Sequence, residues 1–326
     1  MSTASYPAHV FLDLHLECNL RCVQCDIYKL RNPPDELSDD ERQDVIRQVA
    51  AWHPAIRVVL TGGELFLRRR VLYDVAATCA THGVYTTMNT NGTLVSDADV
   101  ERLPTSGIRC VVVSLDSDEA VVHDRIRGVP RTFERAVSTV RRLVAARDRA
   151  GQDFTVLTST IVGRHNLDRI ESMLDFFEGL GVDTTLFQPL QPTFARAMAP
   201  SWWRTDPLFP DDPRQVERGV AALQAARRRG RRVFQTEAQL EDIRHYFGHP
   251  DAMPPGQCAA MDRHLMIDIV GNVRLCFNME RIGLGPIGSV RQTPLRALWE
   301  AERVEATRGK MRGCTEGCGT MLCHAR

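Results

Sequence analysis

The chain has 326 residues, of which 43% are hydrophobic and 25% charged, as is usual for a globular protein with a large core. Its 41 basic residues balance its 41 acidic residues, so no net field favours nucleic acid or an anionic membrane as a partner. No stretch approaches the roughly 20 apolar residues of a transmembrane helix, and the N-terminus lacks the regions of a signal peptide. We therefore expect a cytoplasmic protein, in which ten cysteines indicate metal ligation rather than disulfides.

Short apolar runs alternate with helical patterns from residue 9 to about residue 190, which is typical of repeated βα units and a parallel sheet. Six strands, each followed by a helix, predict an α/β fold with a partial, TIM-like (β/α)6 barrel rather than a closed eight-stranded one. Helix caps are expected at Ser38, Ser96 and Thr132. The expected strands are 10–16, 57–61, 85–89, 110–115, 155–162 and 184–188.

Three cysteines follow the first expected strand with the spacing C-x3-C-x2-C, namely Cys18, Cys22 and Cys25. Three thiolates this close in sequence can hold one metal centre, and a four-iron cluster with three cysteine ligands leaves one iron open. A zinc site completed by His15 is the alternative, but zinc motifs usually combine a C-x2-C pair with a distant second pair.

Polar residues gather where the expected strands end, which is where ligands bind in parallel sheets. In the first strand, alternation places Leu12 and Leu14 toward the helices, and Asp13, His15 and Glu17 toward the barrel interior. A polar interior is costly unless it holds water or a hydrophilic ligand. The other polar groups expected near this end are Gly62-Gly63-Glu64, Asn89, Asn91, Ser114, Asp116 and Gln188.

The chain divides into a barrel at 1–192, a helical connector at 193–257 and a cysteine-rich end at 258–326. The connector contains prolines and two helical patterns, and the last part contains an expected hairpin around Gly271. Five cysteines lie in the last part: Cys258, Cys276, Cys314, Cys318 and Cys323.

The motifs of residues 9–190 together resemble radical S-adenosylmethionine (radical SAM) enzymes. The resemblance implies a [4Fe–4S] cluster on Cys18, Cys22 and Cys25 whose open iron binds S-adenosylmethionine. Gly62-Gly63-Glu64 resembles the family motif that contacts the methionine amino group. Arg127 is expected to pair with the cosubstrate carboxylate, and a surface salt bridge to Asp124 or Glu134 is the alternative. The expected cosubstrate-binding residues are Gly62, Gly63, Glu64, Asn91, Ser114, Asp116, Arg127 and Gln188.

The pattern Cys258-x12-Gly271-x4-Cys276 resembles the opening of the SPASM or twitch extension, which holds auxiliary iron–sulfur clusters in part of this family. The two-cluster pattern needs seven cysteines and only five are present, so we expect one auxiliary [4Fe–4S] cluster. Its ligands are expected among Cys258, Cys276, Cys314, Cys318 and Cys323. One thiol is then left over, and we take Cys323 as the candidate hydrogen-atom donor. A zinc site is the alternative here.

The resemblance implies reductive cleavage of S-adenosylmethionine and abstraction of a substrate hydrogen, with a flavodoxin- or ferredoxin-type protein as external one-electron reductant. We expect a polar small molecule of secondary metabolism, such as a sugar or aminocyclitol of antibiotic biosynthesis, as the substrate. An oxidoreductase would use Asp13 or His15 as the base that takes the hydroxyl proton. An epimerase would use the spare thiol as the hydrogen-atom donor.

Two alternatives remain open. A peptide-modifying maturase of the SPASM type, acting on a ribosomal peptide or a sulfatase, often carries a leader-binding domain, whereas about eight residues precede the first expected strand. The other alternative is a non-enzymatic zinc or iron–sulfur scaffold.

Overall fold

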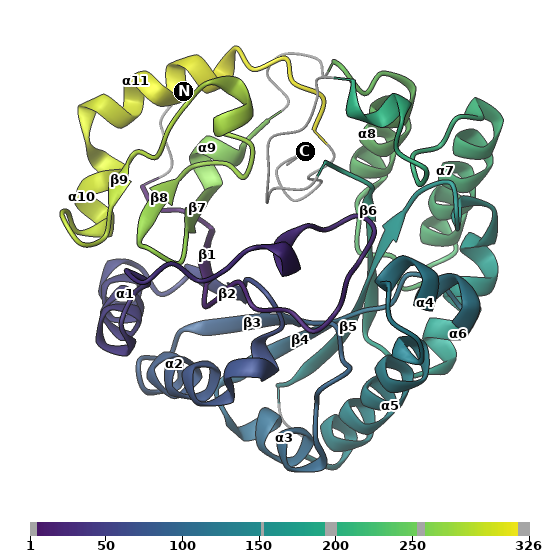
Figure 1. Ribbon diagram of the computed structural model, residues 1–326, viewed down its shortest axis with the longest axis horizontal. Helices are drawn as coiled ribbons and strands as arrows, with labels where there is room; N and C mark the ends of the chain where they lie inside the picture. Colours follow the sequence, from purple (N-terminus) through teal and green to yellow (C-terminus); the bar gives the residue numbers. More distant parts are fainter. Residues whose placement is uncertain (1–4, 151–152, 193–200, 253–257, 319–326) are drawn as a thin grey trace.

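The structure is a computed structural model that describes residues 5–150, 153–192, 201–252 and 258–318. Strands and helices alternate through its first part, as the sequence predicts (Figure 1). The strands are β1 (His9–Asp13), β2 (Arg57–Thr61), β3 (Tyr85–Thr90), β4 (Ile108–Ser114), β5 (Thr155–Val162) and β6 (Thr184–Pro189). The helices are α1 (Asp39–Trp52), α2 (Arg69–Thr81), α3 (Asp97–Arg102), α4 (Ala120–Arg127), α5 (Thr132–Ala150) and α6 (Ile170–Gly179), with short 3-10 helices η1 (Ile27–Lys29), η2 (Leu65–Arg68), η3 (Leu103–Thr105) and η4 (Leu167–Arg169).

The six strands run parallel in one sheet of order β6-β5-β4-β3-β2-β1. Helices lie along the outer side of this curved sheet, and β6 forms one of its edges (Figure 1). The predicted partial (β/α)6 barrel is therefore confirmed.

The cysteine-rich end continues the same sheet. β7 (His264–Ile267) pairs in parallel with β1, and β8 (Asn272–Arg274) and β9 (Gly288–Ser289) follow in antiparallel order. The predicted hairpin around Gly271 is present, with shorter strands than expected. This part also contains α9 (Ala260–Arg263), η6 (Glu280–Ile282), α10 (Leu295–Glu300) and α11 (Glu302–Arg312), and the connector contains η5 (Trp202–Arg204), α7 (Pro213–Arg228) and α8 (Glu237–Gly248).

The two faces of β1 separate the outer core from the barrel interior. Val10 and Leu12 are fully buried in the main core, as expected for residues that face the helices. Phe11 points to the other side and packs with Val59 and Met266, so the middle of the interior is apolar. Asp13 is the last residue of the strand, which ends earlier than predicted.

The helix caps at Ser38 and Ser96 are confirmed, because both form reciprocal capping boxes. At α5 the expected cap is wrong. Thr132 is the first helical residue, and the carboxylate of Asp124 accepts hydrogen bonds from the Thr132 hydroxyl and the backbone N–H of Phe133. No helix within the described ranges is long and apolar enough to cross a membrane.

Candidate active site

The loop that carries Cys18, Cys22 and Cys25 rests on the Gly62-Gly63-Glu64 turn at the end of β2. The backbone N–H of Gly63 donates to the His15 carbonyl at 2.7 Å, and that of Glu64 to the Glu17 carbonyl at 2.8 Å. A Cβ on Gly63 would lie 1.9 Å from the Glu17 carbonyl oxygen, and Gly62 has a φ of +124°. Both positions thus need glycine for the turn to approach the cysteine loop this closely.

The Glu64 carboxylate points into the protein. It is almost fully buried and accepts hydrogen bonds from the Thr90 hydroxyl at 2.8 Å and from the backbone N–H groups of Phe66 and Asn91 at 3.2 and 2.7 Å. Burial raises the pKa of this carboxyl, and the three donors oppose that rise. Glu64 therefore fixes the turn to the end of β3, which leaves the glycine backbone facing the cysteine loop.

Asn91 holds the cysteine loop from the β3 side. Its Nδ2 donates to Asn19 Oδ1 at 2.9 Å, and Asn19 lies between Cys18 and Cys22. The amide of Asn19 donates in turn to the Thr93 hydroxyl at 2.9 Å. The role of Asn91 in binding the cosubstrate stays a prediction, and its side-chain amide positions the cysteine loop.

Arg127 connects the cysteine loop to the end of β4. Its Nη2 lies 2.8 Å from Asp116 Oδ2, and its Nη1 lies 4.0 Å from Cys22 Sγ. Both side chains are buried, with Asp116 wholly inaccessible. The salt bridge to Asp124 or Glu134 considered from the sequence is absent from the described contacts, because Asp124 caps α5 and Glu134 pairs with Arg131.

Asp116 is held from three further directions. Its Oδ1 accepts from the Ile161 N–H at 3.0 Å, its carbonyl accepts from Asn166 Nδ2 at 2.8 Å, and its own N–H donates to His123 Nδ1 at 3.1 Å. Burial, together with the Arg127 charge, lowers the pKa of His123 to about 4. The ring is therefore neutral, which suits its role as a hydrogen-bond acceptor.

Two of the expected ligand-binding side chains have free polar groups. Ser114 ends β4 and Gln188 lies on β6, and both are half-buried on the interior side of the strands. Neither side chain makes a hydrogen bond to another described residue. These groups are thus available to a ligand, unlike those of Glu64 and Asn91.

Asp13 lies beside the C-terminal hairpin, because β7 is the neighbour of β1 in the sheet. The β1–β7 register continues toward Asp268, whose carboxylate pairs with Arg274 at 2.7 Å. Burial raises the pKa of Asp13 to about 7, the Asp268 charge adds to the rise, and Arg274 opposes it. A carboxyl with a pKa near neutral pH can both release and take up a proton, so the role of Asp13 as a base stays a prediction.

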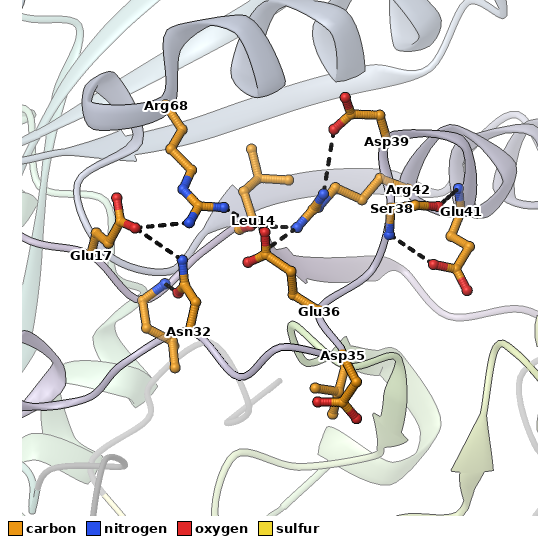
Figure 2. Close-up of polar contacts among 12 residues, drawn as sticks. Leu14, Glu17, Asn32, Asp35, Glu36, Ser38, Asp39, Glu41, Arg42 and Arg68 are labelled. Carbon is orange, nitrogen blue, oxygen red and sulfur yellow. Dashed lines mark hydrogen bonds and ion pairs between the residues drawn. The ribbon is translucent and has the colours of Figure 1, made fainter.

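His15 and Glu17 follow the end of β1, where strand alternation no longer applies. His15 is fully buried, and burial lowers its pKa. Glu17 is exposed and accepts from Arg68 at 2.8 Å, as Figure 2 shows. The expectation that Glu17 faces the barrel interior is therefore wrong. Arg68 also pairs with Glu36 at 2.6 Å and so ties this segment to the loop before α1 (Figure 2).

The described cysteines at the C-terminal end form a second group. The Cys276 pKa is raised by burial and by the thiols of Cys318, Cys258 and Cys314, so the four sulfurs lie near one another. Asn278 donates to two of them, through its backbone N–H to Cys276 Sγ at 3.2 Å and through Nδ2 to Cys318 Sγ at 3.3 Å. Cys323, the candidate hydrogen-atom donor, lies outside the described residues.

Both groups of thiols suit iron–sulfur clusters. Burial raises the pKa of Cys18 and of Cys258 to about 11, so these thiols ionise near neutral pH only with a cation beside them. No three His, Cys, Asp or Glu side chains of the described segments converge as closely as one metal ion requires. A cluster keeps its thiolates farther apart than a single ion does, and the N–H donors and Arg127 supply the contacts that cluster sulfurs accept.

Comparison with known proteins agrees with this chemistry. The model of the radical SAM superfamily matches residues 15–177, and that of the SPASM iron–sulfur cluster-binding domain matches residues 258–323. The chain belongs to the radical SAM superfamily. It is a radical SAM enzyme with two kinds of cofactor. One is a [4Fe–4S] cluster that binds S-adenosylmethionine, and the other is auxiliary iron–sulfur in the SPASM domain.

Particular relatives extend over most of the chain. The AdoMet-dependent heme synthase of Methanosarcina barkeri is 28% identical over 316 residues, covering 91% of this chain and 83% of the relative. The PqqA peptide cyclase of a Methylobacterium species is 24% identical over 299 residues, covering 91% of this chain and 74% of the relative. The solved structure of Streptococcus suis SuiB with S-adenosylmethionine shares the fold, with a TM-score of 0.73 at 16% identity. This match covers 96% of this chain and 73% of the SuiB chain.

Sequence reasoning missed the residues that hold the site together. Asn19, Asn166 and Asn278 act through hydrogen bonds between segments far apart in sequence. Arg42 is buried on α1 and donates to the carbonyl of Leu14, just after β1, at 3.1 Å (Figure 2). A buried arginine in an otherwise amphipathic helix is the signal that points to such a residue.

Proposed function

We propose that this radical SAM enzyme oxidatively modifies a peptide. The observation that carries the proposal is the match to the PqqA peptide cyclase, which spans both the barrel and the cysteine-rich end. The sugar or aminocyclitol substrate expected from the sequence gains no support from these relatives, which are named as heme synthases and peptide-modifying enzymes.

In this proposal the residues at the ends of β2, β4 and β6 bind the cosubstrate. The backbone of Gly62 and Gly63 faces the ammonium group of the cosubstrate, and Arg127 faces its carboxylate. Ser114 and Gln188 face the remaining polar groups of the cosubstrate. Glu64, Asn91 and Asp116 position these groups through the buried contacts described above. When bound, the cluster on Cys18, Cys22 and Cys25 supplies the electron for reductive cleavage of S-adenosylmethionine to a 5′-deoxyadenosyl radical.

The oxidation removes two hydrogens from the peptide. A C–H bond gives a hydrogen atom to the 5′-deoxyadenosyl radical, and the peptide then loses one proton and one further electron. In this proposal Asp13 accepts that proton, and its pKa, which burial raises to about 7, supports this role. Cys258, Cys276, Cys314 and Cys318 would hold the auxiliary cluster that accepts the electron.

The test is anaerobic turnover with S-adenosylmethionine, dithionite and synthetic precursor peptides from neighbouring open reading frames. We expect 5′-deoxyadenosine to form in proportion to a peptide two hydrogens lighter, detected by mass spectrometry. Asp13→Asn should abolish the limb of the rate profile that rises through about pH 7, because its amide cannot take up a proton. Peptides that never change mass and never stimulate 5′-deoxyadenosine formation would refute the proposal.

A second candidate function is a step in heme synthesis. The match to this chain covers 83% of the length of the M. barkeri heme synthase, compared with 74% of the length of the peptide cyclase. The same assay with a tetrapyrrole precursor of heme separates the two candidates, since only the true substrate raises 5′-deoxyadenosine formation above its uncoupled rate.

A further inference from the structure

Helix α4 and the cysteine loop pack against each other. The N–H of Val23 donates to the Ile126 carbonyl at 2.8 Å, and that of Arg21 to the Arg127 carbonyl at 3.2 Å. Gly128 ends the helix with a φ of +70°, and a Cβ there would lie 2.2 Å from the Arg21 carbonyl oxygen. The loop is thus packed directly against the C-terminal end of α4.

This surface exposes apolar side chains. Only four large apolar side chains are strongly exposed among the residues that the structure describes, and two of them, Val121 and Val23, lie here. Val121 is 81% exposed and Val23 is 49% exposed. Val23 lies between Cys22 and Cys25, so any protein that covers it lies beside the cysteine loop.

The same surface is basic. Arg125 lies one helical turn from Val121 on the same face of α4, and Arg21 lies across the contact with the loop. Both are exposed and neither forms an ion pair with another described residue. The acidic neighbours are engaged elsewhere, since Asp124 caps α5 and Glu119 pairs with Arg169 at 3.0 Å.

We propose that this surface, formed by Arg21, Val23, Val121 and Arg125 and called the α4 patch, docks the acidic one-electron carrier protein that reduces the enzyme. Radical SAM chemistry requires an electron from outside the chain, and the α4 patch lies over the loop that receives it. Electron-transfer complexes are small and transient, and opposite charges set their association rate. A basic rim around two exposed valines fits an acidic flavodoxin or ferredoxin in these respects.

The test compares two electron sources on the reconstituted holoenzyme. Formation of 5′-deoxyadenosine is measured with dithionite, and with a flavodoxin reduced by its NADPH-dependent reductase at increasing flavodoxin concentration. Arg125→Glu and Val121→Asp are expected to raise the flavodoxin KM by about tenfold, because they place negative charge opposite an acidic partner. Their dithionite-driven rates should stay at the wild-type value.

Arg109→Glu is the matched control. Arg109 is exposed at the amino end of β4, opposite the end where Ser114 lies, so the same change in net charge there should leave the flavodoxin KM unchanged. Wild-type flavodoxin KM values in both patch variants would overturn the proposal. So would equal losses with dithionite and flavodoxin, or a higher substrate KM with an unchanged flavodoxin KM, which would mark the patch as a substrate surface. The dithionite arm reports cosubstrate cleavage alone, so a wrong peptide assignment would not affect this result.

Discussion

The guanidinium of Arg127 lies 2.8 Å from the carboxylate of Asp116, and the two form a buried ion pair between α4 and the end of β4. The other side of the guanidinium approaches Cys22 Sγ at 4.0 Å. One arginine therefore joins the cysteine loop to the strand end that is expected to bind the cosubstrate. Because both partners are buried, removing one of the two side chains leaves the charge of the other unpaired in the interior.

A double-mutant cycle on this pair should show strong coupling. Asp116→Asn or Arg127→Met alone is expected to lower the free energy of unfolding by about 3–5 kcal/mol, because each leaves a buried charge unpaired. The double variant should lose less than the sum of the two single losses. Anaerobic urea denaturation measures all four proteins, and strictly additive losses would show that the pair does not act as a unit.

Gly63→Ala should reduce cluster loading. The added Cβ would lie 1.9 Å from the Glu17 carbonyl, so the segment that leads into Cys18 must move. We expect a clear loss of iron and of the charge-transfer absorbance after anaerobic reconstitution. Gly179→Ala is the control, since a Cβ there meets nothing within 4 Å. Equal loading of both variants would contradict the close packing of turn and loop.

Cys22→Ala should abolish 5′-deoxyadenosine formation, because the cluster that binds S-adenosylmethionine would lose one of three thiolate ligands. Cys79 provides a comparison within the same chain: it is fully buried in α2, and Cys79→Ala should alter stability while cosubstrate cleavage persists. Chromatographic measurement of 5′-deoxyadenosine with dithionite as reductant decides between these outcomes. Cleavage by the Cys22 variant at the wild-type rate would remove the triad from its assigned role.

Replacement of C-terminal cysteines should separate ligands from the spare thiol. Cys318 lies with Cys258, Cys276 and Cys314, so Cys318→Ala should lower the iron content from about eight atoms per chain to about four. Cys323→Ala should keep about eight if its thiol is not a ligand. Iron analysis with electron paramagnetic resonance of the reduced protein gives the count. Loss of four irons from the Cys323 variant and none from the Cys318 variant would reverse the assignment.

His123 should make stability depend on pH. Its pKa is lowered to about 4 in the folded protein, whereas an unfolded histidine titrates near 6.5. Below about pH 6.5 the unfolded chain gains a proton that the folded chain does not, so the stability present at pH 7 is lost as the pH falls toward 4. At pH 5 this loss amounts to about 2 kcal/mol.

His123→Asn tests this dependence, because an asparagine oxygen can accept the Asp116 N–H without titrating. Urea denaturation at pH 7 and pH 5 should show a loss of stability smaller by about 2 kcal/mol in the variant than in the wild type. An identical loss in both proteins would show that another group dominates the acid sensitivity.

The local patterns of the chain were sufficient for the partial barrel and for its cysteine motifs. Alternating apolar runs and capping residues act within a few positions along the chain, so β2, β5 and the caps at Ser38 and Ser96 agree with their predictions. The family likeness also follows from local spacing, since the C-x3-C-x2-C motif spans eight residues and the Gly-Gly-Glu motif three. The substrate class did not follow from these patterns, because they describe how the radical forms and not which molecule it meets.

The roles of individual polar residues depended on the tertiary structure. Glu64 and Asn91 have the chemistry of ligand-binding groups, yet the Glu64 carboxylate accepts hydrogen bonds from the end of β3, and the Asn91 amide holds the cysteine loop through Asn19. Ser114 and Gln188 make no side-chain hydrogen bond within the described part of the chain. The hydrogen-bond partners of a side chain depend on which segments lie side by side in the fold. Spacing along the sequence does not show which distant segments come into contact.

The sequence by itself therefore determined the radical-generating chemistry, because ligand type and spacing are local properties of Cys18, Cys22 and Cys25. Only the tertiary structure decided that Arg127 joins Cys22 to Asp116, that the hairpin of the SPASM domain brings Asp268 and Arg274 to Asp13, and that the cysteine loop packs against the C-terminal end of α4. Each of these relationships joins residues that are distant along the chain. Their energies come from burial and charge contacts that exist only after the sheet and its helices have packed.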